Sequence, residues 1–280
     1  MIATVGTFDG VHIGHRYLLE QLCRAGRDRG LSPLAVTFDR HPLSLVDPAS
    51  APPVITDSSE QEEAMLALGV KLLRLPFTPG LRAMTGRDFL SMLHERHGVK
   101  ALMTGFNNHL GSDRDRAPEV EGVELVRCAE LPEHSGVSSS RIRTLIADGA
   151  VDRAALLLGR PFTISGTVVG GRQLGRQLGF PTANVSVSPG HVMPAPGVFA
   201  ATVGDYPAVV NVGRRPTVDT PDAPISVEAH LIGFSGNLYG SHLRIGFISR
   251  LRAERRFGSL DELRDAIAAD VGNALSAIRQ

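Results

Sequence analysis

The stretch VGTFDGVHIGHRYLLEQL, residues 5–22, decides the fold of the first part of this chain. A short apolar run leads into it, a turn with several glycines follows, and an apolar-periodic run ends it. This order predicts a strand, a glycine-rich turn and an α-helix. The arrangement suits a phosphate, because the first turn of a helix offers unpaired N–H groups and a partial positive charge.

Two histidines, His12 and His15, stand at the start of the predicted helix. They are three residues apart, so they share one face in a helical first turn. Gly6 and Gly14 let a ligand approach the backbone closely. Two imidazoles there can donate hydrogen bonds to the bridging oxygens of a triphosphate and stabilise charge that develops at the α-phosphorus. The alternative is that both are ordinary surface or capping histidines.

Residues 1–158 alternate short apolar runs with helix-like stretches. Alternation at this spacing predicts a parallel sheet with helices on both faces. The second helix is expected to open on a serine N-cap with a glutamate three residues later. The expected strands are 2–6, 31–38, 71–77 and 100–106, and the expected helices are 15–30, 58–69 and 86–98.

Residues 159–280 follow a different pattern. Short apolar runs are separated by Gly, Pro, Asp and Asn turns, which is typical of an antiparallel sandwich or small barrel. One amphipathic helix is expected at 259–278, with Ser259 as its N-cap and Glu262 three residues later. We expect the boundary between the two domains between residues 158 and 159. The expected strands are 162–171, 197–204, 206–213, 225–233 and 242–251.

The composition narrows the possible functions. The chain has 280 residues, a formal net charge of zero and no apolar run near the roughly 18 residues of a membrane helix. There is no electrostatic case for nucleic acid or an anionic membrane as a partner. Cys23 and Cys128 form no CxxC and no zinc spacing, so we expect reduced thiols in a cytoplasmic protein. The two lysines, Lys71 and Lys100, follow no glycine-rich turn, which excludes a P-loop lysine.

The stretch VSSSRIR, residues 137–143, also suits a phosphate. Its serines can cap the free N–H groups at a helix start. Arg141 and Arg143 can hold phosphate oxygens as charged, multidentate donors. The alternative is a capped helix with solvated arginines.

A second group of candidate functional residues lies in the other half of the chain. In GRQLGFPTAN, residues 175–184, Thr182 and Asn184 fall on one face of an extended segment. A hydroxyl and an amide oxygen are hard ligands that suit Mg²⁺ beside nucleotide phosphates. Glu228 stands in an otherwise apolar strand, where a carboxylate needs a partner or a chemical role. It can act as a general base toward an alcohol, or it can be a strand-edge carboxylate paired to an arginine.

The motif GTFDGVHIGH resembles the signature of the nucleotidylyltransferase superfamily, and more narrowly the adenylyltransferase module of bacterial bifunctional riboflavin kinase/FAD synthetases. TFDRHP at 37–42, TGFNNHLG at 104–111 and VSSSRIR are similar to further motifs of that module. The second half resembles riboflavin kinase over nearly its whole length, through GRPFTISGTVVGG, GRQLGFPTAN, NVGRRPT, VEAHLIGFSGNLYG and LRAERRF. The resemblance implies a Rossmann-like domain followed by a six-stranded antiparallel β-barrel with a C-terminal helix.

The resemblance also implies roles for residues of the first half. His12 and His15 would act in catalysis, and Asn107 would face the flavin phosphate or the adenine site. The residues that would bind ATP or its phosphates are Gly6, Phe8, Asp9, Gly14, Ser138, Ser139, Arg141 and Arg143.

In the second half, the resemblance implies that Thr182 and Asn184 hold the metal and the phosphates. Glu228 would take the proton of the ribityl 5′-hydroxyl of riboflavin. A glycine-rich loop from Gly170 to Gly175 would cover ATP, with either Arg172 or Arg176 in contact with it. The flavin contacts would be Arg252 and Glu254.

These expectations define an enzyme with two activities. Riboflavin kinase makes FMN with ATP, and FMN adenylyltransferase makes FAD with a second ATP and releases pyrophosphate. Mg²⁺ is the expected cofactor, and riboflavin, FMN and ATP are the expected partners. One alternative is a riboflavin kinase with a degenerate first half, because the loop after Gly111 is too short for the helix usual there. The others are a flavin-binding regulatory protein and a tRNA-linked enzyme with a HIGH motif.

Overall fold

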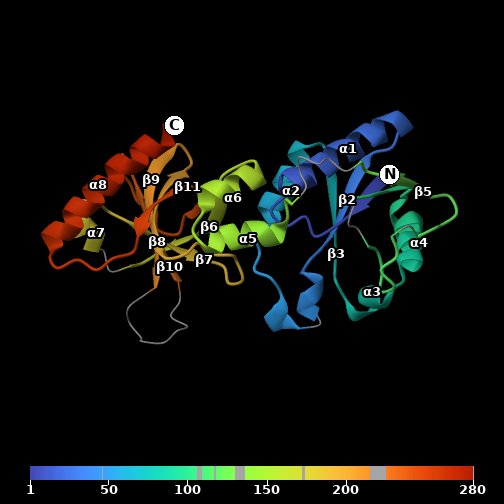
Figure 1. The fold of residues 1–280 in the computed structure, drawn as a ribbon, viewed down its shortest axis with the longest axis horizontal. Helices are drawn as coiled ribbons and strands as arrows, with labels where there is room; N and C mark the ends of the chain where they lie inside the picture. Colours follow the sequence, from blue (N-terminus) through green and yellow to red (C-terminus); the bar gives the residue numbers. More distant parts are fainter. Residues whose placement is uncertain are drawn as a thin grey trace. The chain divides into compact units, whose positions relative to one another are not determined.

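The computed structural model describes residues 1–45, 47–105, 109–116, 118–129, 136–171, 174–214 and 225–279. Contacts divide the chain into two compact units. The first consists of Met1–Pro53 and Asp57–Ser138, and the second of Val54–Thr56 and Ser139–Gln280. Figure 1 shows a sheet with flanking helices in the first unit and a barrel in the second.

The first unit is built on a five-stranded parallel sheet in the order β3-β2-β1-β4-β5. The order reverses beside β1, and in open α/β sheets ligands bind at such a switch point, outside the carboxyl ends of the strands. The strands are β1 (Ile2–Val5), β2 (Pro33–Phe38), β3 (Lys71–Leu75), β4 (Ala101–Thr104) and β5 (Glu124–Arg127). The helices are α1 (Ile13–Arg29), η1 (Pro42–Leu45), η2 (Pro48–Ser50), α2 (Ser58–Ala67), α3 (Pro79–Ala83) and α4 (Gly86–His97).

Both faces of this sheet are covered, as the alternating sequence predicts. Successive residues of β1 point to opposite faces, and Ile2 belongs to one buried cluster while Ala3 belongs to another. Leu22 of α1 packs in the cluster of Ile2, and Phe89 of α4 packs in the cluster of Ala3. The doubly wound arrangement confirms the predicted Rossmann-like fold.

One detail of the first unit differs from expectation. Asp57, not a serine, occupies the N-cap position of α2, and Ser58 is already the first helical residue.

Between β4 and β5, the described residues form no helix. In its place, a tight hairpin joins Leu110 to Asp115 by two backbone hydrogen bonds of 2.8 and 2.9 Å.

The second unit is a closed six-stranded barrel in the order β10-β7-β6-β11-β8-β9. Every neighbouring pair is antiparallel, which confirms the predicted barrel. The strands are β6 (Phe162–Val169), β7 (Ala183–Val187), β8 (Gly197–Val203), β9 (Tyr206–Arg214), β10 (Ile225–Leu231) and β11 (His242–Ala253). The helices are α5 (Ser139–Ala147), α6 (Val151–Leu158), α7 (Leu174–Gln177) and α8 (Leu260–Ile278).

Three phenylalanines fill the barrel. Phe247 stacks on Phe162 with ring centroids 5.8 Å apart and meets Phe199 edge-on at 5.4 Å. Helix α8 packs outside the barrel through Ala274. Its N-cap is Ser259, as predicted, with the hydroxyl accepting a 3.2 Å hydrogen bond from the backbone N–H of the residue three positions later.

Helices α5 and α6 belong to the second unit by their contacts, because Ile142, Ile146 and Leu158 lie in the barrel cluster. The compact units therefore divide between residues 138 and 139. A domain boundary between residues 158 and 159 stays a prediction.

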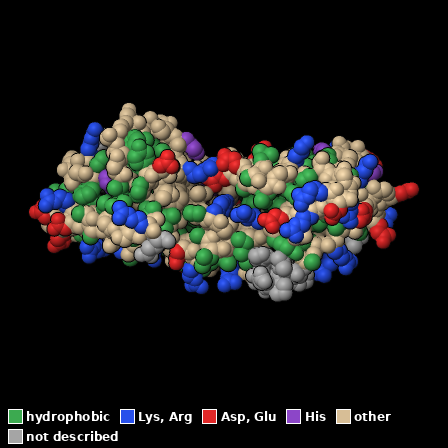
Figure 2. Space-filling model, turned by 90° about the horizontal axis from the view of Figure 1, so that it is seen from above, with side chains coloured by type: hydrophobic (Ala, Val, Ile, Leu, Met, Phe, Trp, Pro, Cys, Tyr) green, Lys and Arg blue, Asp and Glu red, His purple; other side chains and the backbone are tan. Residues whose placement is uncertain are grey.

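No helix among the described residues is long and apolar enough to span a membrane. On the face of the molecule in Figure 2, acidic and basic side chains are interspersed, in keeping with a formal net charge of zero.

Candidate functional sites

The two histidines of the opening motif lie together at the start of α1. His12 is the N-cap residue, with an extended backbone, and its Nδ1 accepts a 3.2 Å hydrogen bond from the backbone N–H of His15. The two rings stack with centroids 3.6 Å apart and an interplanar angle of 14°. His12 precedes the first helical residue, so the two histidines are held together by the N-cap hydrogen bond and by the stacking of their rings. Because Nδ1 of His12 accepts, the neutral ring has its proton on Nε2, where it can donate to a ligand.

Burial keeps both rings neutral. Desolvation lowers the pKa of His12 to about 4. The pKa of His15 is also held well below its usual value, by desolvation first and by the neighbouring His12 second. His15 Nδ1 is buried and has no hydrogen-bond partner among the described residues. A buried polar atom without a partner at a helix start is consistent with a ligand that supplies one.

The turn between β1 and α1 is strained. Phe8 and Val11 have positive φ angles of 49° and 40°, and Gly10 between them has a φ of 88°. Non-glycine residues reach this region at a cost and persist there when the surroundings fix them. The Phe8 side chain is buried in the core of the unit, and its ring meets the His15 ring edge-on with the two centroids 5.3 Å apart. It is therefore the backbone of residue 8 that can meet a phosphate.

A buried polar network that was not predicted holds this turn in place. The Thr7 carbonyl accepts a 2.8 Å hydrogen bond from Gln61 Nε2 and a 3.2 Å bond from Thr37 Oγ1. Arg74 Nη2 in turn donates to Gln61 Oε1 at 2.9 Å. Gln61 is 5% exposed and Thr37 1%. Thr37 lies in the quoted motif TFDRHP, whereas nothing in the pattern of α2 distinguishes Gln61.

A cavity of about 930 Å³ opens at the carboxyl ends of β1 and β2. Its wall includes Gly6 and Thr7 after β1 and residues 109–112 after β4, so it lies at the switch point of the sheet. Its volume falls in the range of ligand pockets. Asn107, predicted to contact the flavin, lies outside the described residues.

The serine–arginine motif is divided between the units. Ser138 ends the first unit, whereas Ser139 begins α5 in the second. On α5, Arg141 is exposed and Arg143 half-buried. These arginines therefore belong to the second unit, whereas the histidines belong to the first.

In the barrel, strand register brings the predicted kinase residues together. Glu228 of β10 pairs with Asn184 of β7 on one side and with Asn211 of β9 on the other. Val185 and Val227 beside them are buried inside the barrel, so by alternation the three polar side chains face outward. Glu228 is half-buried, and among the side chains that the structure describes it forms no ion pair with an arginine. Asn211 was not predicted from the sequence.

The glycine-rich loop lies against the PTAN segment. A Cβ at Gly171 would collide with the side-chain amide of Asn184, and one at Gly175 would collide with the backbone of Phe180. Gly170 has open space around it. His230 Nδ1 donates a 2.8 Å hydrogen bond to the carbonyl of Pro181. The loop and this histidine hold the segment before Thr182 in place.

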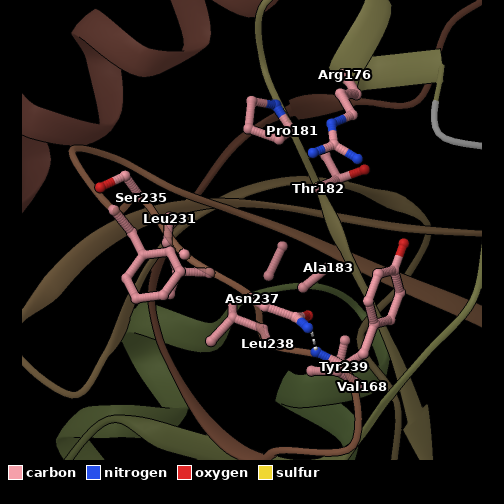
Figure 3. Close-up of a pocket in the computed structure, with 13 residues that line it drawn as sticks. Val168, Arg176, Pro181, Thr182, Ala183, Leu231, Ser235, Asn237, Leu238 and Tyr239 are labelled. Carbon is pink, nitrogen blue, oxygen red and sulfur yellow. Dashed lines mark hydrogen bonds between the residues drawn. The ribbon is translucent and has the colours of Figure 1, made fainter.

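A pocket of about 690 Å³ forms the mouth of the barrel beside Thr182. Apolar residues of β6, β7 and β10 line it, together with the loop from Phe234 to Tyr239. Figure 3 shows Arg176 and Thr182 at one end of this pocket and the Tyr239 ring along its side. Of the two arginines that the sequence left open, Arg176 lines the pocket, and Arg172 lies outside the described residues.

The predicted flavin residues have different surroundings. The guanidinium of Arg252 forms an ion pair with the buried Asp270 of α8, with Nη2 2.8 Å from Oδ2 and Nε 3.0 Å from Oδ1. It therefore anchors the C-terminal helix to the barrel. Glu254 lies beside Gly213. A Cβ atom added at Gly213 would collide with the Glu254 carboxylate and would lie 3.3 Å from the side-chain nitrogen of Asn211.

The oxygen donors of Thr182 and Asn184 fit a magnesium ion chemically, since Mg²⁺ prefers hard oxygen ligands and keeps substrate phosphates and water as its other ligands. The absence of a side chain at Gly171 leaves the Asn184 amide its space. No group of three or more His, Cys, Asp or Glu residues able to hold a metal occurs in the part of the chain that the structure describes. A cation here would depend on nucleotide phosphates for most of its ligands.

Two family models match the chain, one in each half. The FAD synthetase model matches residues 1–125 and the riboflavin kinase model residues 158–278. A bifunctional riboflavin kinase/FMN adenylyltransferase of Pseudomonas fluorescens is 37% identical over 98% of this chain and 91% of its own length. The protein of the same name from Escherichia coli K12 is 37% identical over 96% of this chain and 90% of its own.

A solved structure agrees with the fold. The crystal structure of a protein described as a macrolide-efflux protein from Streptococcus pneumoniae superposes with a TM-score of 0.83 at 30% identity, over 96% of this chain and 91% of that one. Both halves thus match in sequence, and the whole chain matches in structure. The chain belongs to the family of bifunctional riboflavin kinase/FMN adenylyltransferases.

Proposed function

We propose that this chain phosphorylates riboflavin to FMN with one ATP and adenylylates FMN to FAD with a second ATP, releasing pyrophosphate. The observation that supports both steps is that each unit has its own site. The first unit has a neutral histidine pair at the start of α1 and a large cavity whose wall includes Gly6 and Thr7 of the preceding turn. The second has a carboxylate beside an amide in register at the barrel surface. A kinase with a degenerate first half is disfavoured, because the first half matches FAD synthetase from residue 1.

For adenylyl transfer, an oxygen of the FMN phosphate attacks the α-phosphorus of ATP, and pyrophosphate leaves. The Nε2–H group of His12 and the ring of His15 donate hydrogen bonds to the phosphate oxygens as charge develops. The strained turn brings backbone N–H groups close to these oxygens. Gly6, Phe8, Asp9, Gly14 and Ser138 belong to this proposed phosphate site.

For phosphoryl transfer, Glu228 accepts the proton of the ribityl 5′-hydroxyl, that oxygen attacks the γ-phosphorus of ATP, and ADP leaves as the bond to the bridging oxygen breaks. The barrel mouth takes the nucleotide, with Arg176 at its phosphates. The loop from Gly170 to Gly175 covers them. Glu254, close to Asn211, lies at the flavin side of Glu228. The contact of Arg252 with Asp270 suggests a role in holding the last strand and α8 in position.

We also propose Mg²⁺ as the cofactor, held by Thr182 and Asn184. When bound, it neutralises phosphate charge, while the protein residues orient the nucleotide. The expected setting is the cytoplasm, where the free thiols of Cys23 and Cys128 would stay reduced. EDTA should stop FMN formation, and a metal-independent kinase step would contradict the role given to Thr182 and Asn184.

The test is product analysis by chromatography. The chain is incubated with riboflavin, ATP and Mg²⁺, and separately with FMN, ATP and Mg²⁺. We expect FMN followed by FAD in the first mixture and FAD in the second. A chain that makes FMN but no FAD would be a kinase only. A chain that binds flavin but makes neither FMN nor FAD would be a flavin-binding protein, and loss of FMN formation in Glu228→Gln or Thr182→Ala with the fold intact would exclude that alternative.

A further inference from the structure

Two arginines of the first unit face its cavity and have been given no role so far. Arg82 at the end of α3 and Arg114 in the loop after β4 both line the 930 Å³ space. Both side chains are exposed, and among the described residues neither guanidinium has a hydrogen bond or an ion pair. The described residues that line the cavity include no aspartate and no glutamate. The cavity wall therefore carries positive charge, and its two guanidinium groups have no partner among the described residues.

The loop that presents Arg114 is held in one conformation. Arg114 has a φ of 56°, the third non-glycine residue with a positive φ among the described residues. The hydrogen-bonded pair of Leu110 and Asp115 closes the loop around it. Asp113 Oδ1 accepts a 2.9 Å hydrogen bond from the backbone N–H of Gly86, which fixes the loop to the start of α4. A strained residue that is fixed so firmly at a cavity wall indicates a functional constraint.

The catalytic histidines cannot supply positive charge to this site. Their burial keeps them neutral at physiological pH, so they offer hydrogen bonds only. Adenylyl transfer brings two phosphate groups together, and their mutual repulsion needs an opposing charge. Within the first unit, the charged groups at the cavity wall that no described residue neutralises are Arg82 and Arg114.

We propose that Arg82 and Arg114 bind the phosphate of FMN and so make this site select FMN over riboflavin. The inference rests on the proposed adenylyltransferase activity. Riboflavin and FMN differ only in that phosphate, and the same chain must use one as kinase substrate and the other as adenylyl acceptor. Guanidinium forks match phosphate oxygens as paired donors. Phe38, Phe77 and Phe89 of the same cavity provide an apolar surface for a flavin ring.

The test compares steady-state FAD synthesis by the full chain and by the double variant Arg82→Ala/Arg114→Ala. We expect the KM for FMN to rise about 10- to 100-fold, as for lost charge-assisted hydrogen bonds, and the KM for ATP to change less than threefold. Lumiflavin, which has the ring but neither the ribityl chain nor the phosphate, should inhibit both proteins with the same Ki. Arg114→Lys should give an intermediate KM for FMN. Arg87→Ala, an exposed arginine of α4 outside the cavity, is the matched control.

Every other outcome of this test would contradict the inference. A raised KM for ATP would assign the arginines to the nucleotide, and a raised Ki for lumiflavin would assign them to the flavin ring. An unchanged KM for FMN would leave them without a role in acceptor binding. A double variant and an Arg114→Lys variant that make no FAD at any FMN concentration would place the arginines in catalysis or folding. If the unmodified chain makes no FAD, the proposed function itself fails before any variant is compared.

Discussion

The two candidate sites are built in opposite ways. In the first unit, His12 and His15 follow a turn with two strained residues and are held by a cap, a stack and buried polar groups. In the barrel, Asn184 and Glu228 are directly opposed on neighbouring strands of ordinary antiparallel register. The first site thus depends on tertiary contacts from distant segments. The second depends on the register between paired strands, which backbone hydrogen bonds set.

This contrast has a consequence for mutation. A change at the barrel surface removes one chemical group and leaves the register in place, because backbone hydrogen bonds set it. A change in the network under the strained turn removes a support of the histidine site without touching a substrate. The chain divides into two compact units. We therefore expect each change to affect one activity alone.

The largest effect is expected for Glu228→Gln. An amide of the same shape cannot accept the hydroxyl proton, and loss of a general base costs about a thousandfold. FMN formation should fall by that factor, while FAD formation from supplied FMN changes less than twofold. Initial rates measured by chromatography check both. Asp205→Asn, an exposed carboxylate change in the turn before β9, should leave both rates unaltered. A Glu228→Gln variant with a near-normal kinase rate would remove the base from the mechanism.

His15→Ala tests the opposite half of the comparison. Removal of one donor at the developing charge should lower the rate of FAD synthesis about 100- to 1,000-fold, with FMN synthesis unchanged. The control is His97→Ala in the last turn of α4, outside the cavity wall. Equal loss of both activities would show that the sites are not independent.

Much of the architecture could be predicted because it follows from local patterns. Strand–helix alternation predicts the parallel sheet, and short strands with turn residues predict an all-β second half. The six-strand closure and the bifunctional assignment came from the resemblance. The N-cap of α8 at Ser259 was correct, whereas Asp57 holds the N-cap position of α2 without a capping hydrogen bond to its side chain.

What the sequence could not predict lies in contacts between distant segments. The approach of Gln61 to Thr7 spans 54 positions, and no periodicity encodes it. The ion pair of Arg252 with a buried carboxylate on α8, 18 residues later, was not predicted either, and the flavin contact of Arg252 stays a prediction. Asn211 lies beside Glu228 only through the pairing of β9 with β10. Register between strands far apart in sequence is set by the assembled barrel.

The pH dependence should differ between the two units. His12 has a pKa near 4 in the folded chain, against 6.5 for an ordinary histidine. Between pH 4 and 6.5, His12 is therefore protonated in the unfolded chain and neutral in the folded unit. The free energy of unfolding decreases as the pH falls from about 6.5 toward 4. At pH 5 the loss from this group is about 2 kcal/mol relative to pH 7. Pulse proteolysis in urea, with cleavage sites mapped to residues before 139, checks it.

The matched variant for this measurement is His12→Asn. Asparagine is a good N-cap residue and does not titrate, so its stability should depend less on pH than that of the unmodified chain. Parallel curves for the two proteins would contradict the assignment of the pH dependence to His12.

The smallest effect is expected for Gln61→Leu, which tests whether the buried network matters for chemistry. Leucine fills a similar volume but cannot donate to the Thr7 carbonyl, which keeps only its bond from Thr37. The change also removes the bond that Gln61 accepts from Arg74. A buried group left without its partner costs about 1–3 kcal/mol, and we expect the kcat of FAD synthesis to fall about tenfold through displacement of the turn. The KM for ATP in the kinase reaction should stay the same.

The exposed neighbour Glu62→Gln is the control for the Gln61 change. A purely structural role would lower the melting temperature and leave kcat intact at temperatures where the chain is folded. Thr37→Val removes the other donor to the same carbonyl, so the two changes should be non-additive in kcat, as expected for groups that share a partner. Additive effects would mean that the two donors support the histidine site independently, and the turn would then be less dependent on this network than its geometry indicates.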